Sequence, residues 1–287
     1  MNDLASQACS FLFVPASRPE RLQKALASGT DMVIADWEDA VAPQDKAAAR
    51  GALSEALKDL NPVNRARVLV RINAEDTGWH HDDLSALASL VKQGMAGVVV
   101  PKAERLETLD AVAEAAGAQA AVLPLVETVH GLYAVDELAA APYVTRLVFG
   151  HLDFQVDAAI DCGPNEDELL PVRMALVLAS RRAGKAAPVD GVTVDTGNAE
   201  RMKSDAGRAR RMGFGGKLCI HPSQVPTLHA VFDPDAETVA QARKIVQAMN
   251  ETSGGVCVLE GRMIDVPVLK KALATLELHG RAQARIT

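Results

Sequence analysis

Residues 32–60, MVIADWEDAVAPQDKAAARGALSEALKDL, decide the fold because they join one strand to one helix. Met32–Ala35 is a short apolar run without strict alternation, which predicts a strand buried on both faces. Asp45–Leu60 is rich in Ala and Leu and stops before Pro62, as a helix does. The stretch therefore predicts one β–α unit, with acidic residues between its two elements.

The same unit recurs along the chain. The predicted strands are Phe11–Val14, Met32–Ala35, Val68–Ile72, Gly97–Val100, Ala121–Val126, Leu147–Phe149, Pro188–Val192 and Lys217–Ile220. The predicted helices between them include Asp45–Leu60, Asp82–Lys92, Leu106–Ala116, Glu166–Ala183 and Glu200–Met212. Eight β–α units in series predict an α/β fold of the closed TIM (β/α)8 barrel type.

Two local features bear on the start of the barrel. Ser17-Arg-Pro-Glu20 fits a capping box that begins the first helix. A doubly wound open sheet is the alternative fold, and it would normally carry a Gly-rich phosphate fingerprint after the first strand. Val14-Pro15-Ala16-Ser17 has no such fingerprint, which favours the barrel.

A tail follows the eighth unit. The barrel is expected to span residues 1–232, and residues 233–287 to form a C-terminal helical extension. Asp235–Met249 and Val266–Leu278 read as helices, with a strand-like Val256–Leu259 between them. We expect this extension to pack at a subunit interface over the active site.

Composition narrows the function classes. The chain has 287 residues, which suits one barrel of about 250 residues. Its net charge of −7 and the lack of a basic stripe argue against a nucleic-acid partner. Four scattered cysteines, no secretory pattern in Met1–Ser10 and no long apolar run predict a cytoplasmic protein without a membrane partner.

The chemistry of a barrel enzyme lies at the carboxyl ends of its strands. Glu127 and Asp153 follow neighbouring predicted strands, so they are expected to lie close together. Two carboxylates on one rim suit Mg²⁺, with water and substrate oxygens completing the coordination. The alternative is that each caps a helix or pairs with an Arg.

Other polar residues follow the remaining strands. Arg71 has the planar fork that binds a carboxylate, or else it forms a rim salt bridge to Glu38 or Asp39. Lys102 either forms a Schiff base or pairs with an acid. His221 is either structural or lines the site, and the His80-His81 pair is expected in a solvated loop.

The chain resembles the citrate lyase β-subunit (CitE-like) branch of the HpcH/HpaI aldolase and malyl-CoA lyase superfamily. The motifs that carry this resemblance, spread over nearly the whole chain, are Phe13-Val-Pro-Ala-Ser-Arg-Pro-Glu-Arg21, Asp36-Trp-Glu-Asp-Ala-Val41, Val70-Arg-Ile-Asn73, Pro124-Leu-Val-Glu-Thr128, Phe149-Gly-His-Leu-Asp-Phe154, Asp190-Gly-Val192, Gly215-Gly-Lys-Leu-Cys-Ile-His-Pro222 and Gly261-Arg-Met-Ile-Asp265. Together they form a specific signature.

The resemblance implies roles for individual residues. It implies that Glu127 and Asp153 are Mg²⁺ ligands and that Arg71 binds the 2-oxoacid carboxylate. It implies that Glu38 and Asp39 hold metal-bound water and that Asp265 enters the site of a neighbouring subunit. The residues implied to contact the CoA phosphates are Arg18, Arg21 and Lys24. It also implies a homo-oligomer built on trimers. The chain departs from the family at Trp37, where Leu is usual, and at His151, where a small residue is usual.

The implied reaction is a Mg²⁺-dependent cleavage or formation of a 3-hydroxyacyl-CoA-type thioester, such as citryl-, malyl- or citramalyl-CoA, with a 2-oxoacid as the partner product. Asp265 is the candidate for proton transfer at the acyl carbon. The alternatives are a class II aldolase acting on free hydroxy-oxoacids, a lyase subunit that needs an acyl carrier, and a barrel kept only for ligand binding.

Overall fold

The computed structural model describes residues 3–251 and 256–286. The chain divides into two compact units, one ending at Leu228 and the other beginning at His229. The first unit holds all eight barrel strands and the second holds a small helical assembly.

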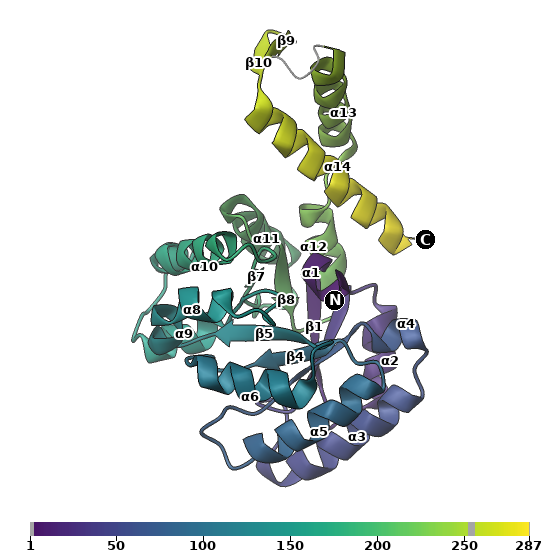
Figure 1. The fold of residues 1–287 in the computed structure, drawn as a ribbon, viewed down its shortest axis with the longest axis vertical. Coiled ribbons are helices and arrows are strands. Elements are labelled where there is room, and N and C mark those ends of the chain that lie inside the picture. The colour runs from purple at the N-terminus through teal and green to yellow at the C-terminus, as the bar shows by residue number, and fades with distance from the viewer. Residues whose placement is uncertain (1–2, 252–255, 287) are drawn as a thin grey trace. The chain divides into compact units, whose positions relative to one another are not determined.

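The first unit is a closed parallel barrel with the strands in chain order. Figure 1 shows helices on the outside of these strands. The strands are β1 (Ser10–Pro15), β2 (Met32–Asp36), β3 (Val68–Arg71), β4 (Gly97–Val100), β5 (Ala121–Val126), β6 (Val148–Phe149), β7 (Val189–Asp190) and β8 (Gly216–Cys219). The barrel closes because β8 pairs in parallel with β1, with Leu218 opposite Phe11. The predicted TIM barrel is confirmed, and the open-sheet alternative is wrong.

Helices surround the strands in the order that the β–α repeat requires. They are α1 (Asp3–Gln7), α2 (Glu20–Ala27), α3 (Lys46–Lys58), α4 (Pro62–Arg65), α5 (His80–Lys92), α6 (Leu106–Ala116), α7 (Val129–Tyr133), α8 (Val135–Ala140), α9 (His151–Asp157), α10 (Leu170–Arg182), α11 (Ala199–Met212) and α12 (Gln224–Phe232), with 3-10 turns at Pro43–Asp45 and Asp167–Leu169. The expected capping box at Ser17 is wrong. Helix α2 begins only at Glu20, and its N-cap Pro19 makes no side-chain hydrogen bond.

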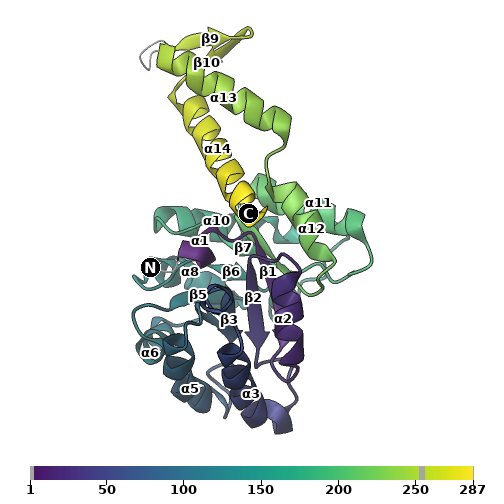
Figure 2. The ribbon, with the colours of Figure 1, turned by 90° about the vertical axis from the view of Figure 1, so that its right-hand side faces the viewer.

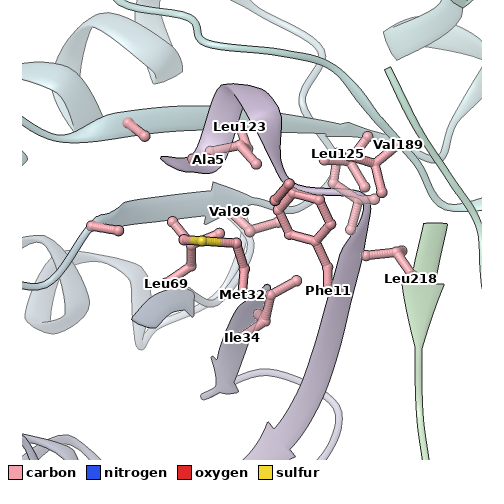
Figure 3. Close-up of a cluster of buried hydrophobic side chains, with 14 residues drawn as sticks. Ala5, Phe11, Met32, Ile34, Leu69, Val99, Leu123, Leu125, Val189 and Leu218 are labelled. Atoms are coloured by element: carbon pink, nitrogen blue, oxygen red, sulfur yellow. The ribbon is translucent and has the colours of Figure 1, made fainter. Parts of the chain in front are cut away.

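The amino-terminal end of the barrel is filled by apolar side chains. Ala5 of α1 belongs to the same buried cluster as Phe11, Met32 and Leu123 (Figure 3). Arg146 fixes this end, since its Nη1 donates to the carbonyl oxygens of Ala8 at 2.7 Å and Ala5 at 3.1 Å. The core thus begins at this end of the barrel and extends to Leu125 and Leu218 near the carboxyl ends of the strands.

The second unit contains α13 (Ala236–Glu251), β9 (Cys257–Leu259), β10 (Arg262–Ile264) and α14 (Val266–Ile286). The two helices pack against each other, and β9 and β10 form an antiparallel ribbon where the chain turns between them (Figure 2). Helix α14 is longer than the predicted segment, which ended at Leu278. Among the described residues, no helix is long and apolar enough to cross a membrane.

Candidate active site

A cavity of about 390 Å³ opens at the carboxyl ends of the barrel strands. Its lining residues come from the ends of seven of the eight strands and include Phe13, Pro15, Asp36, Asp39, Arg71, Leu125, Glu127, Phe149, Gly150, His151, Leu152, Asp153, Val192, Leu218 and Ile220. Apolar side chains form its floor, and carboxylates with one guanidinium form its polar side. We call it the mouth cavity.

Glu127 follows β5 and is buried at the edge of this cavity, 3% exposed. Its Oε1 accepts a hydrogen bond of 2.8 Å from the backbone N–H of Lys102, a residue with a positive φ of +43°. Burial, with Glu38 next in effect, raises the pKa of Glu127 to about 8. The carboxylate is therefore costly to ionise unless a cation joins it.

Asp153 lies in the first turn of α9 and lines the same cavity, with an exposed side chain. The chain before it comes very close to Glu127, since a Cβ built on Gly150 would lie 2.5 Å from Glu127 Oε2. Only glycine fits there without displacing the carboxylate. The structure thus brings Glu127 and Asp153 into one cavity, as their strand positions predict.

Arg71, at the end of β3, is held by Asp36 at the end of the neighbouring β2. Its Nε and Nη2 reach Asp36 Oδ1 and Oδ2 at 2.7 and 2.6 Å, a two-point contact buried from solvent. Burial alone would lower the pKa of Arg71, but the paired carboxylate of Asp36 raises it. The guanidinium is therefore a fixed positive charge beside the cavity, with Nη1 turned toward Glu38 and Asp39.

Glu38 and Asp39 complete the acidic side of the cavity. Arg71 Nη1 lies 2.8 Å from Glu38 Oε2 and 3.2 Å from Asp39 Oδ2. The alternative of a rim salt bridge from Arg71 is therefore present, and Glu38 Oε2 takes part in this ion pair without a hydrogen bond among the described residues. Burial raises the pKa of Glu38 to about 7, against the opposing charge of Arg71.

The donor set fits a hard divalent cation. Glu127, Asp39 and Asp153 line one cavity with the guanidinium of Arg71, and Glu38 pairs with that guanidinium. Glu127 is the buried carboxylate of this set, and a divalent cation beside it would offset the cost of its ionisation.

Asp36 was not predicted to act in the site, although the acidic run after β2 contained it. It accepts backbone N–H groups of Glu38 at 3.0 Å and Ala40 at 3.1 Å besides binding Arg71. Its position at the last residue of the strand, before two further acids, was the available signal. It shapes the loop that carries Glu38 and Asp39.

Lys46 is a second residue that sequence reasoning missed. This buried ammonium donates to the carbonyl oxygens of Trp37 and Glu38 at 2.8 and 2.9 Å, and to Asn73 Oδ1 at 2.5 Å. Asn73 is fixed in turn by Asp83, which accepts from its backbone N–H and its Nδ2 at 2.7 Å. Lys46 thus ties the loop after β2 to the loop after β3.

Several predicted residues lie away from the chemistry. Lys102 has an exposed side chain, which does not fit a desolvated Schiff-base lysine. His80 is not in a solvated loop: it is buried at the start of α5 with its Nδ1 2.9 Å from the Asn73 carbonyl oxygen. His221 is exposed with its Nδ1 2.7 Å from Ser223 Oγ, and Trp37 is fully buried and does not line the mouth cavity.

The two remaining groups of predicted residues lie outside the lining of the mouth cavity. Arg18, Arg21 and Lys24 are all exposed, on the turn after β1 and on α2. Asp265 lies between β10 and α14 in the second unit, where its Oδ1 accepts the backbone N–H of Val268 at 3.1 Å. Its observed contact is therefore that of a helix N-cap.

Known proteins are similar to this chain in sequence and in fold. Residues 9–222 match the model of the HpcH/HpaI aldolase/citrate lyase family. The chain is 35% identical over 276 residues to a citrate lyase subunit beta-like protein of Deinococcus radiodurans, covering 93% of this chain and 95% of that one. It is 30% identical over 290 residues to the L-malyl-CoA/beta-methylmalyl-CoA lyase of Cereibacter sphaeroides, covering 91% of each.

Solved structures agree with these relatives. The crystal structure of CitE from Mycobacterium tuberculosis with magnesium, acetoacetate and coenzyme A superimposes with a TM-score of 0.81 at 34% identity, covering 96% of this chain and 99% of that chain. The citrate lyase beta subunit of M. tuberculosis with oxaloacetate and magnesium gives a TM-score of 0.70 at 34% identity, covering 81% and 100%. The barrel, the acidic rim and these matches together show that the chain belongs to the HpcH/HpaI aldolase/citrate lyase family.

Proposed function

We propose that this protein is a Mg²⁺-dependent carbon–carbon lyase that cleaves or forms a 3-hydroxyacyl-CoA-type thioester, with a 2-oxoacid as one product. The observation that carries the proposal is the set of carboxylates facing Arg71 in the mouth cavity. Relatives that bind magnesium with oxaloacetate, or magnesium with acetoacetate and coenzyme A, support the same chemistry.

In this proposal Glu127 and Asp153 hold the cation, and Glu38 and Asp39 accept hydrogen bonds from the water around it. When bound, Mg²⁺ supplies Lewis-acid stabilisation of the negative charge that develops on the substrate oxygens. Asp36 occupies Nε and Nη2 of Arg71, so the carboxylate of the 2-oxoacid unit would bind at Nη1, where it would share the guanidinium with Glu38 and Asp39.

The reaction is a retro-aldol type of cleavage. A base removes the proton from the substrate hydroxyl, the carbon–carbon bond breaks, the 2-oxoacid leaves, and the remaining thioester enolate takes up a proton. Glu38 suits the first transfer, because a carboxyl with a pKa of about 7 gains and loses a proton readily at neutral pH.

Asp265 is the proposed proton donor to the enolate carbon, delivered from a neighbouring subunit of a trimer-based homo-oligomer. Asp265→Ala is then expected to slow turnover without weakening Mg²⁺ binding, and an unchanged rate would assign the transfer elsewhere.

Arg18, Arg21 and Lys24 form the proposed contact for CoA phosphates, since all three are basic and exposed on one segment. We place the enzyme in the cytoplasm.

The metal site is tested by binding rather than by activity. Titration of the purified protein with Mg²⁺ and pyruvate by calorimetry should give a ternary complex, and Glu127→Gln or Asp153→Asn should weaken it at least tenfold. Glu55→Gln, in an exposed ion pair with Lys58, is the matched control. Unchanged binding in both site variants would end the metal assignment.

Two rival functions are distinguished by substrate. A class II aldolase would turn over free hydroxy-oxoacids at the same site, and an acyl-carrier-dependent subunit would be inactive on CoA thioesters. The basic residues at positions 18, 21 and 24 favour the CoA substrate over the free hydroxy-oxoacid of the aldolase.

A further inference from the structure

A second cavity adjoins the mouth cavity on the side of β6 and β7. It measures about 410 Å³ and is formed by the segments after these strands, including Cys162, Glu166 and Thr193. Three residues line both cavities: His151, Leu152 and Val192. Of these, only His151 is buried, whereas Val192 is half-buried and Leu152 is exposed. The imidazole is therefore the inner part of the wall between the two cavities.

The surroundings of His151 hold its ring in place. It is the first residue of α9, and a Cβ built on Gly191 would lie 2.1 Å from its Nδ1, so the ring rests directly on the backbone after β7. On its other sides, Nε2 lies 3.6 Å from Glu166 Oε1, and the ring centroid lies 6.2 Å from that of Phe149.

Glu166 is itself held by three arginines, of which Arg201 reaches its Oε1 at 3.4 Å. Its Oε2 accepts hydrogen bonds from Arg173 at 2.5 Å and from Arg208 at 2.9 Å. Arg173 in turn donates at 3.0 Å to Asp190 at the end of β7. Because this ionic group joins α10, α11 and β7, the wall behind His151 is anchored to three elements and cannot easily move aside.

The place of His151 decides which part of a substrate it meets. It lies two residues before Asp153 on α9 and directly follows Gly150, which packs on Glu127, and all four residues line the mouth cavity. A ligand unit held by Glu127 and Asp153 is therefore the part nearest this wall. In the proposed function that unit is the 2-oxoacid.

We propose that His151 is a specificity-determining residue that separates the mouth cavity from the second cavity and so limits the size of the side group on the 2-oxoacid unit. This inference rests on the proposed function. Next to the ring, the shared wall is made of Leu152 and Val192, and beyond it the second cavity also carries polar residues such as Glu166. A gap at position 151 would therefore admit an unbranched side group that lies against Leu152 and Val192.

The test compares binding of pyruvate and 2-oxohexanoate, each with Mg²⁺, to the wild-type protein and to His151→Ala by calorimetry. A pocket discriminates by about tenfold or more per methylene. The ratio of 2-oxohexanoate to pyruvate affinity should therefore rise at least tenfold in His151→Ala. His151→Thr, which keeps a short polar side chain at the helix start, is the second variant if the alanine protein does not fold.

Val194→Ala is the matched control, because Val194 lines only the second cavity and is exposed. Its ratio should stay at the wild-type value. An unchanged ratio in the His151 variants, or an equal rise in Val194→Ala, would overturn the partition role while leaving the proposed function intact. Failure of the wild-type protein to bind either 2-oxoacid with Mg²⁺ would instead overturn the proposed function, and this inference with it.

Discussion

Glu127 and Gly150 are in such close contact that a side chain at position 150 would meet the Glu127 carboxylate: the built Cβ lies 2.5 Å from both Glu127 Cβ and Oε2. The end of β6 thus packs directly on the carboxylate that follows β5. This contact fixes the direction in which the proposed metal ligand points.

Gly150→Ala is expected to displace the Glu127 carboxylate and weaken Mg²⁺ binding by roughly tenfold to a hundredfold, the usual cost of disturbing a residue that orients a ligand. Calorimetry with Mg²⁺ and pyruvate measures it. Gly163→Ala is the control, since a Cβ there meets only Glu168 at an ordinary 3.6 Å. Equal affinities for wild type and Gly150→Ala would show that the contact does not position the ligand.

Asp36→Asn should raise KM for the carboxylate-bearing substrate more than it lowers kcat. Asparagine cannot match both guanidinium contacts of 2.7 and 2.6 Å, so Arg71 loses its fixed direction and the substrate carboxylate loses its anchor. Steady-state kinetics should show a fall in kcat/KM of roughly tenfold or more. A fall in kcat alone, at unchanged KM, would place Arg71 in the chemical step and not in substrate binding.

Stability should depend on pH through the buried acids. Burial raises the pKa of Glu127 to about 8, above its ordinary 4.5, so the folded chain holds more protons than the unfolded chain between these values. The free energy of unfolding contributed by this group is therefore present in full below pH 4.5 and is lost as the pH rises to about 8.

Denaturant unfolding in EDTA measures this dependence. The wild-type protein should lose on the order of a few kcal/mol more than Glu127→Gln across that range, at about 1.4 kcal/mol per pKa unit. Added Mg²⁺ should reduce the loss, because it stabilises the ionised carboxylate. Parallel curves for the two proteins would show that Glu127 ionises normally in the folded chain.

Lys46→Met tests the link between the loops after β2 and β3. The change keeps much of the side-chain volume but leaves three oxygen acceptors without their donor, two of them buried on Trp37 and Asn73 and one part-buried on Glu38. We expect a loss of about 3 kcal/mol or more in the free energy of unfolding. Lys58→Met, on the exposed Glu55 pair, should change it by less than about 0.5 kcal/mol. Similar losses in both would remove the special role of Lys46.

The barrel could be predicted because each of its strands corresponds to a separate short apolar run in the sequence. Even β6 and β7, only two residues long, lie within predicted runs, since the flanking Leu147 and Pro188 extend the apolar pattern. Helix α1 (Asp3–Gln7) could not be predicted, because it is short. Its contact with the barrel includes a hydrogen bond from Arg146 to the Ala5 carbonyl oxygen, and these two residues are 141 positions apart.

The proposed metal pair could also be placed from sequence, since neighbouring parallel strands end at the same rim. The supporting residues could not. Asp36 and Lys46 act through contacts 35 and 27 positions away, to Arg71 and Asn73, and no local pattern encodes such pairs. His80 was misplaced because a polar HisHis pair looks like a loop, whereas here it opens α5 and packs on the Asn73 carbonyl.

Turnover on a panel of 3-hydroxyacyl-CoA thioesters, malyl-, citramalyl- and citryl-CoA, with Mg²⁺ or with EDTA tests the central claim most directly. Released 2-oxoacid is followed through a coupled dehydrogenase. The account predicts release from at least one thioester with Mg²⁺, none with EDTA, and none from Glu127→Gln under either condition. Release that persists in EDTA, or that survives in Glu127→Gln, would contradict a metal-dependent lyase built on this carboxylate.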